Sequence, residues 1–192
     1  LTNIVFMGMG EPLLNYDQLT KALEVFNAPD GFNIGSRHIT VSTIGIPDKI
    51  IKLAQDWPQV NLAVSLHAPK NELRKKLIPI NDVYPIPQLI KTIEQYIALT
   101  HRRVTIEYSM WTDINDQREY AFQLASLLRG LLVHVNLIPG NPIAECHFVP
   151  SSPARVMTFA RILEENKINV TIREPRGQDI GAACGELYGL HN

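Results

Sequence analysis

Cysteine is scarce in this sequence: the 192 residues include two, Cys146 and Cys184. Two thiols are too few for a disulfide framework or for a thiolate metal site. The motifs Cys-x-x-Cys, His-Glu-x-x-His and GxxxxGK[ST] are also absent, which removes the main support for common zinc, zincin and P-loop chemistries. We therefore expect a reduced, cytosolic protein with two thiols.

Long apolar runs and an excess of one charge are lacking as well. No stretch of about 18 apolar residues occurs, so we expect neither a membrane span nor a membrane partner. Lys plus Arg number 18 against 19 for Asp plus Glu, which argues against a surface that is basic throughout but leaves room for a local basic patch. A chain of this length with 45% hydrophobic residues suits one globular domain.

That single domain is expected to span residues 1–192, with 168–192 as a C-terminal strand and a cysteine-bearing tail. Residue 1 is Leu, and 1–6 has none of the basic character of a signal peptide start. We expect the chain to begin within a strand of something larger.

Strand-like and helix-like segments alternate six times along the chain. Parallel strands need crossover helices, so the alternation predicts an α/β fold with a parallel sheet. A doubly wound sheet and an incomplete (β/α) barrel both fit, whereas a full eightfold barrel needs about 250 residues. Apolar runs such as 4–7 favour a sheet that is covered on both faces. The expected strands are 3–7, 38–43, 60–66, 103–108, 131–138 and 169–173.

Small and polar residues follow five of these strands, in segments 8–12, 42–45, 65–69, 107–110 and 139–142. In parallel α/β folds, ligands gather at the carboxyl ends of the strands. Each segment alone reads most simply as a turn. Together they predict one binding site at that edge of the sheet.

Five motifs carry a resemblance to a known family. Phe-Met-Gly-Met-Gly-Glu-Pro-Leu-Leu-Asn (6–15) and Gly-Gln-Asp-Ile-Gly-Ala-Ala-Cys-Gly (177–185) are the most specific, and 64–69, 104–108 and 136–139 lie between them in the family's order. The chain resembles the RlmN/Cfr family of radical S-adenosylmethionine enzymes, which methylate an adenine of 23S ribosomal RNA. The motif at 177–185 favours the branch that targets adenine C2. The resemblance implies a partial (β/α) TIM-type radical-SAM barrel missing its first strand and helix, with tRNA as a second substrate.

The resemblance also implies where the cofactor S-adenosyl-L-methionine binds. Gly10 and Glu11 match the element that holds its amino group, and a carboxylate can accept charge-assisted hydrogen bonds from an ammonium. The other positions that match cofactor-contacting residues are Ser42, Ser65, Leu66, His67 and Asn141.

Cys184 matches the cysteine that is methylated to an S-methylcysteine intermediate and then delivers its carbon, as a radical, to the adenine. Adenine C2 is not nucleophilic, so direct polar methyl transfer faces a prohibitive barrier. A thiolate, by contrast, is a good acceptor for the first, polar step. Glycines 177, 181 and 185 would let such a tail move. Cys146 has no counterpart in the family.

One departure from the family is large. Its [4Fe–4S] cluster is held by three thiolates in a Cys-x3-Cys-x2-Cys loop, and this sequence has no such loop. An upstream partner cysteine and an upstream glutamate base are also missing. We therefore expect the chain alone to be inactive, and the cluster with its electron donor to belong to the full-length enzyme. Strand 3–7 should be an unpaired edge that promotes self-association, unless strand 169–173 covers it.

Basic residues provide a possible RNA surface, although a run of charges is as often a solvated face. Two other functions stay open. The chain could be a non-catalytic cofactor- or RNA-binding barrel, or an unrelated barrel enzyme such as an aldolase. The last needs a Schiff-base lysine on a strand, and the expected strands contain none. The basic residues are Lys70, Arg74, Lys75, Lys76, Arg102, Arg103, Arg173 and Arg176.

Overall fold

The computed structural model describes residues 1–8, 10–140 and 148–173. Six parallel strands form one sheet in the order β1-β2-β3-β4-β5-β6. A doubly wound sheet reverses its strand order at a switch point, and this sheet does not, so it is an open part of a (β/α) barrel. The prediction of a partial barrel is confirmed. The strands are β1 (Ile4–Phe6), β2 (Ile39–Thr43), β3 (Asn61–Ser65), β4 (Val104–Met110), β5 (Val133–Pro139) and β6 (Asn169–Ile172).

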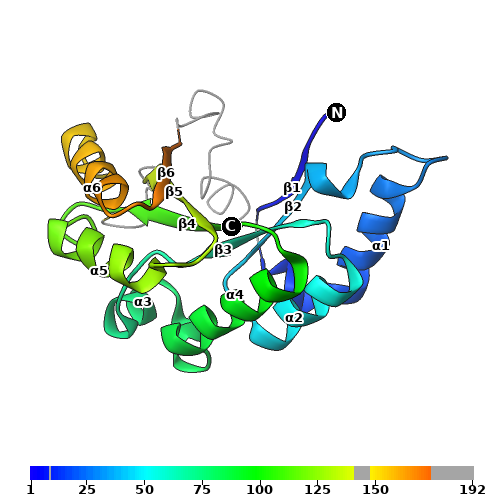
Figure 1. The fold of residues 1–192 in the computed structure, drawn as a ribbon, viewed down its shortest axis with the longest axis horizontal. Coiled ribbons are helices and arrows are strands. Elements are labelled where there is room, and N and C mark those ends of the chain that lie inside the picture. The colour runs from blue at the N-terminus through cyan, green and yellow to red at the C-terminus, as the bar shows by residue number, and fades with distance from the viewer. Residues whose placement is uncertain (9, 141–147, 174–192) are drawn as a thin grey trace, which may run out of the picture.

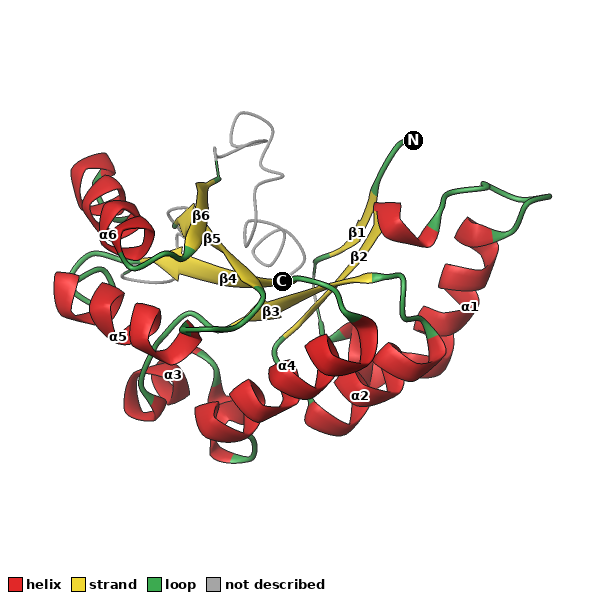
Figure 2. Cartoon of the chain, viewed as in Figure 1, coloured by secondary structure: helices red, strands yellow, loops and turns green. Residues whose placement is uncertain are grey.

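The sheet is curved, and the helices lie along its convex side (Figure 1 and Figure 2). Among the described residues, no helix has the length and apolarity needed to cross a bilayer. The helices are α1 (Tyr16–Asn27), α2 (Pro47–Asp56), α3 (Asn71–Leu77), α4 (Ile86–Thr100), α5 (Arg118–Leu128) and α6 (Pro153–Glu165), with 3-10 turns η1 (Pro12–Asn15), η2 (Ser36–His38) and η3 (Pro79–Asp82).

Strand β4 shows how the two faces differ. Ile106 and Tyr108 are fully buried in the core beneath the helices, and the Tyr108 ring lies 5.2 Å from the ring of Phe159 on α6. Because successive side chains of a strand point to opposite faces, Glu107 and Ser109 face the concavity. Among the described residues, the helices cover only the face that holds Ile106 and Tyr108 (Figure 1), and the expectation of a sheet covered on both faces stays a prediction.

The two edge strands remain apart along their length. Within the described ranges, β1 pairs with β2 alone and β6 pairs with β5, so β6 does not cover the outer edge of β1. Val5 on β1 is 53% exposed. At the carboxyl end, however, Arg173 Nη1 lies 3.5 Å from Met7 Sδ. One side-chain contact thus spans the opening between the edge strands.

Candidate cofactor site

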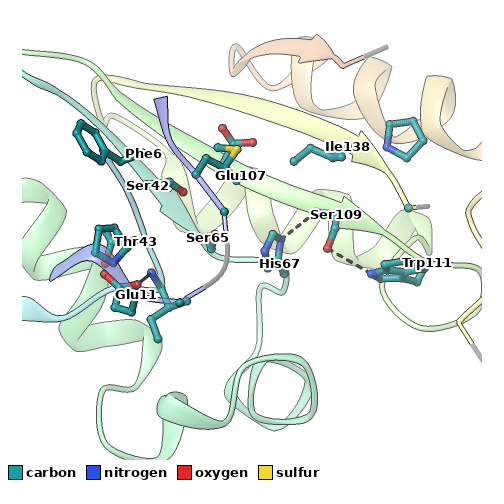
Figure 3. Close-up of a pocket in the computed structure, with 17 residues that line it drawn as sticks. Phe6, Glu11, Ser42, Thr43, Ser65, His67, Glu107, Ser109, Trp111 and Ile138 are labelled. Carbon is teal, nitrogen blue, oxygen red and sulfur yellow. Dashed lines mark hydrogen bonds between the residues drawn. The ribbon is translucent and has the colours of Figure 1, made fainter. Parts of the chain in front are cut away.

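The carboxyl ends of β1 to β5 surround a cavity of about 290 Å³ (Figure 3). Five of the predicted site residues line it: Gly10, Glu11, Ser42, Ser65 and His67. They come from three different strand ends, 8–12, 42–45 and 65–69, and the strand order alone makes them neighbours. These polar strand ends therefore line one cavity, and that the cavity binds a ligand stays a prediction.

The remaining predicted residues are placed differently. Leu66 does not line the cavity, because its side chain is fully buried in the hydrophobic core. Asn141 and Cys184 lie outside the described residues, as does Cys146. Their roles stay predictions.

Glu11 joins two loops at one side of the cavity. It follows Gly10, whose φ of +87° is a conformation that side chains rarely adopt. Glu11 Oε1 accepts the N–H of Leu13 (3.0 Å), which caps η1, and Oε2 accepts the N–H of Ile44 (2.7 Å) beyond β2. A carboxylate has about four acceptor positions, so each oxygen can still accept a hydrogen bond from a ligand.

His67 lines the cavity between Ser65 and Ser109 (Figure 3), in a left-handed backbone conformation with φ +56°. Its Nδ1 accepts a hydrogen bond from the main-chain N–H of Ser109 (2.9 Å). A main-chain amide can only donate, so Nδ1 carries no proton and the neutral ring carries its proton on Nε2. Burial, aided by the charge of Arg74, lowers the pKa of His67 to about 4.

Arg74 is the largest correction to the sequence analysis. It belongs to α3, a helix that the sequence did not predict, and it is fully buried rather than part of an RNA-facing surface. Its Nε donates to the carbonyl of Leu66 (3.2 Å), and its Nη2 donates to the carbonyls of Ser65 (3.1 Å) and Ile44 (2.6 Å). Nη1 donates to Asn81 Oδ1 (3.2 Å). Arg74 thus holds the ends of β2 and β3 together from beneath the cavity.

Its charge has no carboxylate partner among the described residues, since all of these acceptors are neutral oxygens. Burial lowers the pKa of Arg74 to about 10, so the guanidinium keeps its charge at neutral pH. The neighbouring lysines are different: Lys70 and Lys75 are exposed and reach Glu119 (3.5 Å) and Asp82 (2.9 Å). A basic run in a sequence gives no sign of which member turns inward.

Glu107 of β4 is the second carboxyl group that lines the cavity, after Glu11, and 5% of its surface is exposed. Its Oε2 accepts a hydrogen bond from Asn136 Nδ2 of the adjacent β5 (2.9 Å). Burial raises the pKa of Glu107, although the Asn136 hydrogen bond and the charge of Arg173 oppose the shift. Its place in segment 107–110 was predicted, but its own contribution to the site was not.

The far side of the cavity is apolar. Trp111 and Ile138 line it, and Trp111 Nε1 donates to Ser109 Oγ (3.3 Å). The indole packs so tightly on Gly140 that a Cβ there would lie 2.4 Å from Trp111 Cζ3. Sequence reasoning missed Trp111, because its position is set by packing between the ends of β4 and β5.

No metal centre is formed by the described part of the chain, where no group of three or more His, Cys, Asp or Glu residues could hold an ion. The whole sequence contains two cysteines. A [4Fe–4S] cluster of the radical S-adenosylmethionine type needs three thiolates. The residues of this chain therefore do not fit such a cluster.

An open partial barrel of parallel strands, with a cavity that has both polar and apolar walls, defines a class of proteins that bind ligands at the carboxyl edge of the sheet. The model of the radical SAM superfamily matches residues 1–125. The chain therefore belongs to the radical SAM superfamily, and the predicted resemblance is confirmed.

Curated relatives agree with that assignment. A probable dual-specificity RNA methyltransferase RlmN from Geobacillus kaustophilus is 52% identical over 97% of this chain and 51% of its own length. The protein of the same description from Dictyoglomus thermophilum is 49% identical over 100% of this chain and 55% of its own length. The chain thus spans about half the length of the curated relatives it matches.

Solved structures show the same architecture. A radical SAM methyltransferase from Sphaerobacter thermophilus superimposes with a TM-score of 0.95 at 48% identity, covering 97% of this chain and 55% of the other. A domain of pyruvate-formate lyase-activating enzyme from Bacteroides vulgatus gives a TM-score of 0.69 at 18% identity, covering 91% of this chain and 100% of that domain. The second likeness concerns the fold alone.

Proposed function

We propose that this chain is the barrel part of a radical SAM RNA methyltransferase that methylates C2 of adenine in 23S ribosomal RNA and in tRNA, with Cys184 as the residue that carries the methyl group. The observation that carries the proposal is the convergence of five predicted site residues on one cavity. The names of the relatives, dual-specificity RNA methyltransferases, support the substrate class.

The cavity fits S-adenosylmethionine by the chemistry of its walls. Glu11 at one side offers acceptors for an ammonium group, and the short hydroxyls of Ser42 and Ser65 suit ribose hydroxyls. At the opposite side, Trp111 and Ile138 offer an apolar surface for a purine ring (Figure 3). When bound, this cofactor supplies the methyl group. Main-chain atoms of Leu66 and the side chain of Asn141 complete the proposed set of contacts.

The iron–sulfur cluster and its electron donor need residues other than those of the cavity. We propose that the thiolates of the [4Fe–4S] cluster, and the surface for its electron donor, lie in a part of the protein beyond this sequence. The chain forms one domain, acts in the cytoplasm, is inactive without those thiolates, and self-associates through the outer edge of β1. A non-catalytic module that binds the cofactor or RNA is the second candidate, favoured by the lack of cluster ligands.

The cofactor assignment is tested by calorimetric titration of S-adenosylmethionine into the protein. We expect one site per chain and weaker binding by Glu11→Gln, which loses one anionic acceptor. Glu72→Gln, an exposed change on α3, serves as the matched control. Wild-type protein that is folded and does not bind, or Glu11→Gln that binds as the wild type does, contradicts the assignment.

The methyl-carrier assignment is tested in cells that express the full-length protein. The two cysteines supply a matched pair. Cys184→Ala should abolish 2-methyladenosine in 23S ribosomal RNA, whereas Cys146→Ala should leave it unchanged. Mass spectrometry of digested RNA gives the measurement. Undiminished methylation by Cys184→Ala refutes the carrier role, and loss in both variants shows that the effect is not specific.

A further inference from the structure

Tertiary hydrogen bonds hold His67 in a strained backbone conformation. Its left-handed φ of +56° costs of order 1–3 kcal/mol for a residue other than glycine and persists only where the surroundings enforce it. Unlike a left-handed residue at the end of a helix, His67 lies two residues beyond the end of β3, so no helix cap explains its conformation. Asn115 Nδ2 donates to the His67 carbonyl (2.9 Å) and to the Ser109 carbonyl (2.6 Å), which ties this turn to β4.

The imidazole of His67 replaces a main-chain acceptor in the sheet. Leu66 N–H donates to the Glu107 carbonyl (3.1 Å), as expected where β3 runs beside β4. In a continued parallel ladder, the N–H of Ser109 would donate to the Leu66 carbonyl. Two other donors fill that carbonyl instead, the Ala68 N–H (2.8 Å) and Arg74 Nε (3.2 Å), and the Ser109 N–H donates to His67 Nδ1 (2.9 Å). Arg74 and the tautomer of His67 are therefore physically linked.

We propose that Arg74 and Asn115 are positioning residues of the cavity, which fix His67 so that its neutral ring presents the Nε2–H to the bound cofactor as a hydrogen-bond donor. The inference rests on the proposed function for the identity of the ligand, S-adenosylmethionine. No described residue accepts a hydrogen bond from Nε2, and the ring lines the cavity (Figure 3). A donor there suits a ribose or carboxylate oxygen.

The charges around His67 act in opposite directions. Arg74 lies beneath it on α3, and the cavity walls contribute the carboxyl groups of Glu107 on β4 and Glu11 before η1. The Arg74 charge and burial both disfavour an imidazolium and lower the pKa of His67. A carboxylate would favour it, but Glu107 itself binds its proton more readily than usual because burial raises its pKa. The ring therefore stays neutral at the pH of the cell.

The tautomer is tested directly by NMR of protein with ¹⁵N-labelled histidine, with the His67 signals assigned by their loss in His67→Gln. We expect one tautomer, protonated on Nε2, that stays neutral from pH 8 to about pH 5. An Nδ1–H tautomer, or an imidazolium at pH 6, overturns the proposal without any ligand present. Arg74→Lys keeps the charge but cannot make the same hydrogen bonds, so it should let His67 populate both tautomers. Asn115→Asp should raise the pKa of His67, and exposed Lys76→Gln should do neither.

Cofactor binding gives the second readout. His67→Gly keeps the left-handed conformation and removes the donor, so we expect about three- to tenfold weaker binding of S-adenosylmethionine, the size of one hydrogen bond. His67→Gln restores a donor and should recover part of the affinity. His101→Gly is the matched control, because His101 also has a left-handed φ, +53°, but is exposed at the end of α4. It should bind as the wild type does.

The two failures are distinguishable. If wild-type protein does not bind S-adenosylmethionine, the proposed function fails, while the tautomer spectrum still decides the roles of Arg74 and Asn115. If the cofactor binds, but His67→Gly binds equally well and the Nε2–H signal does not move, the donor role is wrong. Should Arg74→Lys fail to fold, the Asn115→Asp spectrum still tests the positioning of His67, and the two glycine variants test its role as a donor.

Discussion

The hollows at the two ends of the sheet differ in size and, more tellingly, in how their lining residues are held. The hollow at the amino end is larger, about 650 Å³ against about 290 Å³ at the carboxyl end, and is lined by Asn61 and the basic segment 101–103. There, Arg102 donates to Asn61 Oδ1, but its Nε has no partner among the described residues. At the carboxyl end, Glu11, His67 and Arg74 each bridge separate chain segments.

His67 at the carboxyl end of the sheet and His101 at the amino end show the same difference between the two ends. Both have a left-handed backbone, with φ of +56° and +53°. His101 ends α4, where its N–H donates to the Ile97 carbonyl (2.8 Å), a common way for a helix to stop. His67 ends no helix and is held by Asn115 and Ser109. Its strain is maintained by tertiary contacts, which marks the carboxyl end as the preorganised one.

The largest expected effect is a difference in stability between variants of two neighbouring basic residues, Arg74 and Lys75. Arg74→Met should lower the free energy of unfolding by about 3–5 kcal/mol, because it removes four hydrogen bonds that a fully buried side chain donates. Lys75→Met, which removes an exposed pair with Asp82, should cost less than about 1 kcal/mol. Urea denaturation measures both. Equal losses would mean that Arg74 does not hold the two strand ends.

The next effect is a pH dependence specific to His67. Its pKa is about 4 in the folded chain, below the ordinary 6.5 of an unfolded one. Between these values the unfolded state binds the extra proton, so stability is lost as the pH falls from about 6.5 to about 4, by up to about 3 kcal/mol. Denaturation at several pH values should show this loss in the wild type and in His101→Gln. It should be missing in His67→Gln, and an unchanged slope there contradicts the account.

Glu107 should show a smaller effect of opposite sign. Its pKa is raised on folding, so the folded state holds the proton more tightly and stability falls as the pH rises through the window above the usual carboxyl value. Glu107→Gln keeps an acceptor for Asn136 and removes the buried charge, so at pH 8 we expect it to be more stable by about 1 kcal/mol. Thermal denaturation at pH 5 and pH 8 checks this. A less stable Gln variant at pH 8 would show that the carboxylate is not penalised.

The smallest effect sharpens the comparison of the two histidines. His101→Gly relieves a left-handed conformation without loss of a tertiary contact and should change stability by less than about 1 kcal/mol, in the stabilising direction. His67→Gly relieves the same conformation but deprives Ser109 N–H of its acceptor, so it should show no net gain. Thermal denaturation of the two variants, side by side, gives the measurement. A clear gain for His67→Gly would mean that the Ser109 contact contributes little.

The sheet and most of the cavity could be predicted because they follow from local patterns. Apolar strands alternate with helical stripes, and parallel strands place their carboxyl ends at one edge, so Glu11, Ser42 and Ser65 meet without further information. Arg74 and Trp111 could not be predicted. Whether a basic side chain turns inward, or an indole packs on a distant glycine, depends on atoms brought together only by the complete fold. The same holds for Glu107, whose surroundings come from β5 and β6.

The central claim, that the carboxyl end of the sheet is the cofactor site, is tested most directly by mapping amide chemical shifts while S-adenosylmethionine is added to ¹⁵N-labelled protein. The account predicts shifts that saturate together at Gly10, Ser42, Ser65 and Ser109, with residues 101–103 unaffected. Shifts confined to 101–103 and Leu132 at the amino end, or no saturable shift at the carboxyl end, would contradict it.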